Sequence, residues 1–271
     1  MDAGKKVEEE EGGYKMDVKL LSKDKEGKKI SFAFTGTTDW FVNTIRRLMI
    51  EEVPTLAIED VEFRDNSSAL YDEIIAHRMG LIPIKTDLKS YNLPGECSCK
   101  GKGCAKCSLK MTLKAKSQGI VYAEEIKSKD TKCKPVHSKL PVVKLMKGQS
   151  IQAEITAVMG KGKKHMKWSP CFVWYRGWPE FIIGKNADLK ACVDQCPQLE
   201  QSGNNLKIKD ITKWNEAYEE ICEKNGVNIQ NSKTDFIFNL ESWGQLDVKD
   251  IVKETVNIFQ KKLEDFTKQL K

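Results

Sequence analysis

Residues 66–83 form the most clearly punctuated segment of the chain and read Asn66-Ser-Ser-Ala-Leu-Tyr-Asp-Glu-Ile-Ile-Ala-His-Arg-Met-Gly-Leu-Ile-Pro83. Ser67 or Ser68 can cap a helix whose first turn carries Asp72 and Glu73, where the helix dipole favours anions. A histidine and an arginine lie in the last turn, followed by a glycine suited to a left-handed exit and then by a proline. The segment therefore predicts a short helix with a sharp end.

The residues upstream predict two strands and another helix. Alternation over residues 15–34 favours two strands around a turn at Lys25-Glu26-Gly27. A helix is expected over 38–52, because Pro54 prevents its continuation. Its apolar stripe contains Phe41, Ile45 and Leu48.

The residues downstream complete an α+β pattern. A strand is expected over 55–63, a mostly strand-like region over 109–183, and a polar helical region over 186–226. A further strand over 235–241 precedes a long amphipathic helix over about 247–270. Its apolar positions recur at spacings of three and four. They are Val248, Val252, Val256, Phe259, Leu263, Phe266 and Leu270.

Composition sets limits on the class of protein. The chain has 271 residues and a net charge of +6, from 45 basic and 39 acidic residues. This excess permits an acidic neighbour without requiring one. The acidic tail over 1–13 is expected to be disordered. With no targeting signal and no long apolar run, the protein is expected to be cytoplasmic, with no membrane partner.

Four closely spaced cysteines predict a metal site. Cys97, Cys99, Cys104 and Cys107 lie in a loop rich in glycine and lysine. Four thiolates at this spacing can surround one tetrahedral ion, and a closed thiolate set is typical of structural zinc. The sequence thus predicts one structural zinc ion, with four free thiols as the alternative.

A second pair, Cys192 and Cys196, precedes a proline and is similar to the end of a ferredoxin cluster run. That run requires cysteines at the positions of Leu189 and Asn186, so two of four ligands are missing. A ferredoxin-like module without an iron–sulfur cluster is expected. A residual cluster or a disulfide between the two is the alternative. Cys133, Cys171 and Cys222 are expected to be ordinary single thiols.

The basic, glycine-rich stretch over 160–168 does not have the spacing of a phosphate-binding loop. It is interpreted as a turn that contacts either phosphate or an acidic protein. The sequence has no nucleophile elbow, no acidic triplet for magnesium and no dinucleotide fingerprint. No active site is expected in this chain.

Several segments together resemble one family: the bacterial alpha, eukaryotic third-largest and archaeal D subunits of multisubunit DNA-directed RNA polymerase. They are residues 43–47 with 52–60, 66–83, 143–149, 160–168 and 236–246.

The resemblance implies a discontinuous dimerisation domain over 14–50 and 232–271. It also implies a mostly β insert domain over 51–184, with the cysteine-rich zinc loop at 94–108. The small helical, ferredoxin-like insertion over 185–231 favours the archaeal branch.

The resemblance further implies a non-catalytic assembly platform in transcription. The chain would form an obligate heterodimer with the small alpha-like subunit L, and contact the large catalytic subunits and small zinc-binding subunits. DNA would be reached only through the complex, to which the nucleotidyltransferase activity belongs. The implied partner interface consists of Phe41, Ile45, Arg46, Arg47, Leu48, Val252, Val256, Phe259, Leu263 and Phe266.

Two other functions remain open on the residues alone. One is a free zinc-binding protein that holds nucleic acid through 160–168. The other is a ferredoxin-like redox protein that uses Cys192 and Cys196.

Overall fold

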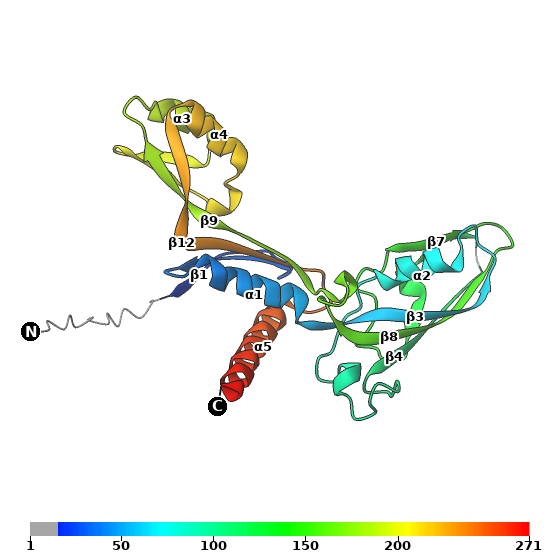
Figure 1. Cartoon of the computed structure of the whole chain (residues 1–271). Helices are drawn as coiled ribbons and strands as arrows, with labels where there is room; N and C mark the ends of the chain where they lie inside the picture. The colour runs from blue at the N-terminus through cyan, green and yellow to red at the C-terminus, as the bar shows by residue number, and fades with distance from the viewer. Residues whose placement is uncertain (1–15, 117, 271) are drawn as a thin grey trace, which may run out of the picture. The chain divides into compact units, whose positions relative to one another are not determined.

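The computed structural model describes residues 16–116 and 118–270 (Figure 1). The tail expected over 1–13 lies outside the described residues. The fold is α+β, as the sequence predicts, and divides into two compact units. The first unit comprises the described chain up to Ser22, Ser31–Val42 and Tyr175–Phe238. The second comprises Lys23–Ile30, Asn43–Trp174 and the chain from Asn239 onwards.

The second unit contains a four-stranded antiparallel sheet in the order β3-β8-β4-β6. The strands are β3 (Pro54–Asn66), β4 (Ser108–Ala115), β6 (Ile126–Ser128) and β8 (Ile151–Lys161). Apolar residues alternate along β8, which places one face of the strand in the core. The buried residues of β8 are Ile151, Ala153, Ile155, Ala157, Met159 and Gly160.

Further elements complete this unit. Strands β5 (Gly119–Tyr122) and β7 (Pro141–Leu145) form a second, two-stranded sheet. Helix α2 (Asp72–Gly80) packs against β3 and β7 and buries Ile75 and Met79 in the same core (Figure 1). Three single 3-10 turns connect the strands. They are η1 (Pro94–Glu96), η2 (Ala123–Glu125) and η3 (Met166–Trp168).

The predicted cap of α2 is wrong. Its N-cap residue is Tyr71, which makes no side-chain capping hydrogen bond. The hydroxyl of Ser67 donates to the carbonyl of Ser150, and that of Ser68 donates to the side chain of Asn66. Both serines are therefore engaged in fixing the end of β3, and neither caps the helix.

The predicted left-handed exit of α2 is also wrong. Gly80 is the last helical residue, and Leu81 follows with φ −89°. The backbone amides of Leu81 and Ile82 donate to Arg78 and Met79. These hydrogen bonds, each to the residue three positions earlier, satisfy carbonyls at the end of the helix. In the predicted left-handed exit, hydrogen bonds around the glycine would have satisfied them instead.

A second four-stranded sheet has the order β1-β2-β12-β9. Its strands are β1 (Asp17–Lys23), β2 (Lys29–Thr35), β9 (Cys171–Ile183) and β12 (Val227–Ser242). Helix α1 (Asp39–Glu51) follows β2. Aromatic rings form the packing here: Phe32 stacks on Phe238 at 4.9 Å, and Phe34 meets Phe238 edge-on at 5.6 Å.

The region over 186–226 is only partly helical. It contains α3 (Leu189–Gln195) and α4 (Glu216–Lys224), which contact one another, and the single turn η4 (Ile211–Lys213) (Figure 1). Between the helices lies a hairpin that the sequence pattern did not predict, formed by β10 (Leu199–Ser202) and β11 (Asn205–Ile208). Gly203 has φ +61° at its turn, a conformation that glycine adopts without strain.

Helix α5 (Val248–Gln269) agrees with the predicted long helix. Only Val248, Ile251 and Thr255 are buried in it. Over the described residues, no helix is long and apolar enough to cross a membrane.

Candidate functional site

The structure brings the four predicted metal-binding cysteines together. The Sγ atoms of Cys97 and Cys104 are 3.5 Å apart, and those of Cys99 and Cys107 are 3.4 Å apart. All four Sγ atoms lie within 4.8 Å of one another. In a tetrahedral site with zinc–sulfur bonds of about 2.3 Å, sulfurs are about 3.8 Å apart. The cysteines therefore fit one tetrahedral ion.

Tight turns produce this arrangement. The backbone amide of Lys100 donates to Cys97, and that of Cys107 donates to Cys104. Lys100 and Gly101 both have positive φ, +52° and +79°, and so fold the chain back between the two cysteine pairs. The loop ends where β4 begins, so the sheet anchors Cys107.

The electrostatics of the loop favour a cation. Hydrogen bonds from the backbone and thiol groups of Cys104 and Cys107 lower the pKa of Cys99 to about 6. Burial raises the pKa of Cys107 to about 12. A bound cation would favour the thiolate of each cysteine, and the exposed lysines of the loop would offset the negative charge of four thiolates. Four sulfur ligands leave no open position, so the site is suited to a structural ion.

The structure also shows a buried thiol trio, Cys192, Cys196 and Cys222, which the sequence pattern did not predict. Cys192 lies on α3, Cys196 caps the end of α3, and Cys222 lies on α4; all three are fully buried. Cys222 lies beside the other two in one buried cluster. Burial raises the pKa of all three thiols. The prediction that Cys222 stands alone is therefore wrong.

The trio contains no disulfide. Within the described part of the chain, the four-cysteine loop is the only group of three or more cysteine, histidine or carboxylate ligands close enough to hold an ion.

The basic stretch over 160–168 is largely engaged within the chain. Lys161 pairs with Glu52 at 3.1 Å, and Lys164 pairs with Glu59 at 3.6 Å. Lys167 also pairs with Glu59 and lies 4.4 Å from the centre of the buried Trp168 ring. These lysines therefore have structural roles.

The glycines of this stretch have structural roles too. A Cβ on Gly160 would lie 2.4 Å from the Trp168 ring, and one on Gly162 would lie 1.9 Å from the carbonyl oxygen of Ile50. His165 accepts a hydrogen bond from the amide of Lys167 at 3.0 Å and so caps η3. The glycines of this stretch are thus required by close packing against Trp168 and Ile50, and three of its lysines pair within the chain.

The predicted partner-interface residues fall into two groups in the structure, one mostly buried or half-buried on α1 and one mostly exposed on α5. On α1, Ile45 and Leu48 are only 9% and 7% exposed, so the chain itself covers them. Phe41 is half-buried. On α5, by contrast, Val256, Leu263 and Phe266 are 54%, 50% and 60% exposed.

The other predicted interface residues have local contacts. Arg46 donates to the side chain of Asn43 at 2.9 Å, and Arg47 pairs with Glu51 at 3.0 Å. Val252 and Phe259 are half-buried. We call Val252, Val256, Phe259, Leu263 and Phe266 the α5 stripe.

Comparison with known proteins identifies the class. Residues 59–169 match the family model described as the RNA polymerase Rpb3/RpoA insert domain. These residues contain the β3-β8-β4-β6 sheet from the first bulge of β3 onwards, together with α2 and the cysteine loop.

Whole-chain relatives identify the family. The chain is 34% identical to DNA-directed RNA polymerase subunit Rpo3 of Methanosphaera stadtmanae, over 92% of this chain and 97% of the relative. It is also 34% identical to the Rpo3 subunit of Methanosarcina acetivorans, over 92% and 96% of the two chains. The Rpo3 subunit of Picrophilus torridus is 36% identical, over 80% and 86%. The chain belongs to the Rpo3 family of DNA-directed RNA polymerase subunits.

Proposed function

We propose that this chain is the alpha-like assembly subunit of a multisubunit DNA-directed RNA polymerase, of the archaeal D type. It pairs with the small alpha-like subunit L, and the pair is the platform on which the large catalytic subunits and small zinc-binding subunits assemble. The observation that carries this proposal is the end-to-end similarity to Rpo3 subunits. The chain is non-catalytic, and it reaches DNA, in the cytoplasm, only as part of the complex.

The α5 stripe supports a partner at the C-terminal helix. Every described residue of α5 from Gln260 onwards is exposed, including Leu263 and Phe266. Large apolar side chains in a row at helical spacing are typical of a surface that another polypeptide covers. Subunit L is the partner that the family resemblance implies.

Co-expression with subunit L tests the pairing. We expect a soluble 1:1 heterodimer, and we expect Leu263→Asp to abolish it, because an unpaired charge in an apolar interface costs several kcal/mol. Leu263 is half exposed, so the variant chain itself should still fold.

Asn257→Asp is the matched control. Asn257 is exposed and lies about 120° around the helix from Leu263, at about 100° per residue. Dimers that survive Leu263→Asp as well as Asn257→Asp would show that the α5 stripe is not the interface. The proposed function itself would be contradicted if the tagged chain, purified from its host, did not bring the other polymerase subunits with it.

We further propose that Cys97, Cys99, Cys104 and Cys107 hold one structural zinc ion. The sulfur separations, near those of a tetrahedral site, support zinc. Elemental analysis should give one zinc and no iron per chain. Cys104→Ser should lose the metal and loosen the loop, while the sheets keep their fold. Stoichiometric iron would contradict the assignment, as would zinc retained in Cys104→Ser.

A further inference from the structure

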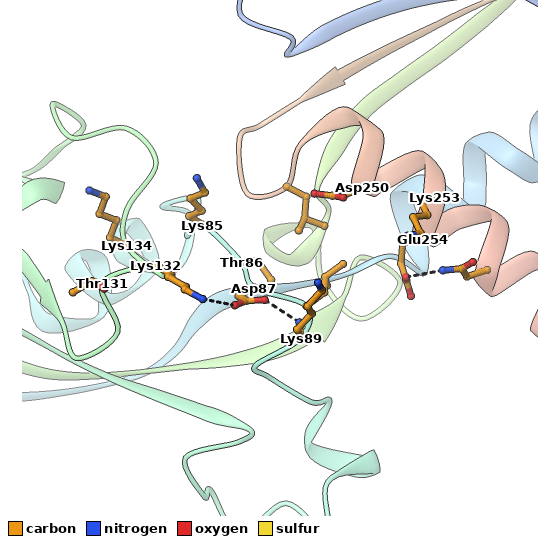
Figure 2. A pocket seen from close by; sticks show the side chains of 13 residues that line it. Lys85, Thr86, Asp87, Lys89, Thr131, Lys132, Lys134, Asp250, Lys253 and Glu254 are labelled. Atoms are coloured by element: carbon orange, nitrogen blue, oxygen red, sulfur yellow. Dashed lines mark hydrogen bonds and ion pairs between the residues drawn. The ribbon is translucent and has the colours of Figure 1, made fainter.

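A charged cavity of about 750 Å³ lies in the second unit, and its lining includes none of the four loop cysteines and none of the residues of the α5 stripe (Figure 2). One wall is formed by the loops over 85–89 and 131–134. The other is the first half of α5, preceded by Leu246. No role described above uses this cavity.

The loop wall is held in place by backbone hydrogen bonds. The amide of Lys85 donates to the carbonyl of Lys134 at 2.9 Å, so these two lysines lie on adjoining strands of chain. The amide of Thr86 donates to the carbonyl of Gln245 at 2.9 Å, which fixes the loop to the turn before α5. Backbone hydrogen bonds thus hold the two loops together and fix them to the turn before α5.

The loop wall is basic. It carries Lys85, Lys89, Lys132 and Lys134, all exposed, and a single carboxylate, Asp87. Asp87 is already engaged: it accepts a hydrogen bond from the Lys89 amide and pairs with Lys132 at 3.6 Å (Figure 2). It also accepts a hydrogen bond from the Ser90 hydroxyl.

Three lysines of this wall have no ion-pair partner among the described residues. Among the described residues, no carboxylate lies within ion-pair distance of the amino groups of Lys85, Lys89 or Lys134. This wall therefore presents three uncompensated positive charges to whatever occupies the cavity.

The α5 wall has a different charge, and this limits the occupant. It carries Asp250 and Glu254 beside Lys253 (Figure 2). A nucleic acid, whose phosphates repeat along every part of its backbone, would meet these two carboxylates as well as the lysines. A polypeptide can place carboxylates against the loop wall and other groups against α5.

We propose that this cavity docks an acidic segment of another polymerase subunit, whose carboxylates pair with Lys85, Lys89 and Lys134. The inference rests on the proposed function, because the partner belongs to the same complex. It adds a contact that is separate from the pairing through α5.

Carbodiimide cross-linking of the assembled polymerase tests this contact, since the reagent joins a lysine amine to a carboxylate only where the two touch. The tagged chain is purified from its host with its companions, treated with nuclease, cross-linked and analysed by mass spectrometry. We expect Lys85, Lys89 or Lys134 to be joined to an aspartate or glutamate of another polypeptide. Acetylation of the three amines should be about tenfold slower in the complex than in the free chain, because a paired amine is removed from solvent.

Lys114 and Lys116 are the matched controls, because both are exposed and lie in the same unit outside the cavity. Equal acetylation of the three cavity lysines in the free and assembled chain would overturn the proposal. So would protection that nuclease removes, or protection without a cross-link to a carboxylate. Failure of the chain to co-purify with polymerase subunits would instead contradict the proposed function, so the two failures are distinct.

Discussion

Glu52 fixes the C-terminal helix to the unit that carries it, and its removal is the sharpest test of how that helix is positioned. One carboxylate oxygen accepts from Lys161 at 3.1 Å and the other accepts from Lys262, on α5, at 3.0 Å. The Glu52 side chain is only 12% exposed. Glu52→Gln keeps the shape but replaces one oxygen with an amide group that cannot accept a hydrogen bond from a lysine.

The expected loss follows from this geometry. A hydrogen bond between charged groups contributes about 1.5–3 kcal/mol when buried and about 0–1 kcal/mol when exposed. Both lysines are partly exposed, so Glu52→Gln should lower the free energy of unfolding by about 1–2 kcal/mol. The control is Glu51→Gln, which removes the exposed pair with Arg47 and should cost about 0.5 kcal/mol or less.

The difference between wild type and Glu52→Gln should also depend on pH. Burial opposes ionisation of Glu52, but the hydrogen bonds and charges of Lys262 and Lys161 outweigh it and hold its pKa below the ordinary 4.5. A lowered folded-state pKa contributes stability that is present above the unfolded-state pKa and lost as pH falls through the folded-state value. The difference should be full at about pH 7, shrink below about pH 4.5 and disappear in stronger acid.

Urea unfolding of the full chain across this pH range measures the effect, and hydrogen exchange of the α5 amides locates it. We expect faster exchange in α5 beyond Thr255, where Lys262 is the tie to Glu52. The reasoning would be refuted by a loss no greater than that of Glu51→Gln. Unchanged exchange in α5, or a difference that persists in strong acid, would refute it as well.

Three further outcomes are expected. Gly162→Ala should lower the free energy of unfolding by about 1–3 kcal/mol in urea unfolding, because its Cβ would overlap the Ile50 carbonyl. Gly95→Ala is the control and should be near neutral, because no described residue other than its chain neighbours comes within 4 Å of a Cβ at that position. A thiol reagent should titrate Cys97, Cys99, Cys104 and Cys107 once a chelator is added, but Cys192, Cys196 and Cys222 only after denaturation, because burial raises their pKa; reaction of the trio in the native chain would contradict this. Neutralising Lys161, Lys164 and Lys167 should lower stability and leave an already weak DNA affinity almost unchanged, since all three pair with Glu52 or Glu59; a steep loss of DNA binding in a filter assay would favour the nucleic-acid function instead.

Features set by nearby residues could be predicted from the sequence. The four-cysteine loop spans only eleven residues, so spacing alone brings its thiols within reach of one ion. The hairpin over 15–34 follows from alternation, and the helices over 38–52 and 247–270 follow from apolar periodicity. Each of these depends on contacts that are close in sequence.

Features set by packing between distant residues could not be predicted. Cys222 joins Cys192 and Cys196 only because α4 packs on α3, and no local pattern marks that contact. Ser67 is a suitable cap by residue type, but its hydroxyl donates instead to the carbonyl of Ser150, which is distant in the sequence. The glycines over 160–168 indicate by residue type a turn that contacts phosphate or an acidic protein, although what requires them is the Trp168 ring and the Ile50 carbonyl.

Helix α5 shows why apolar periodicity alone cannot separate a core from an interface. Val248 and Val256 are both part of one sequence stripe, yet Val248 is buried and Val256 is 54% exposed. The residues that the chain itself buries, Val248, Ile251 and Thr255, are confined to the first third of the helix. Beyond them the apolar residues continue for more than two turns, and Val256, Leu263 and Phe266 are each at least half exposed. A helix that had only to cover its own domain would gain nothing from Leu263 and Phe266, so these residues are the strongest physical reason to expect a second polypeptide on α5.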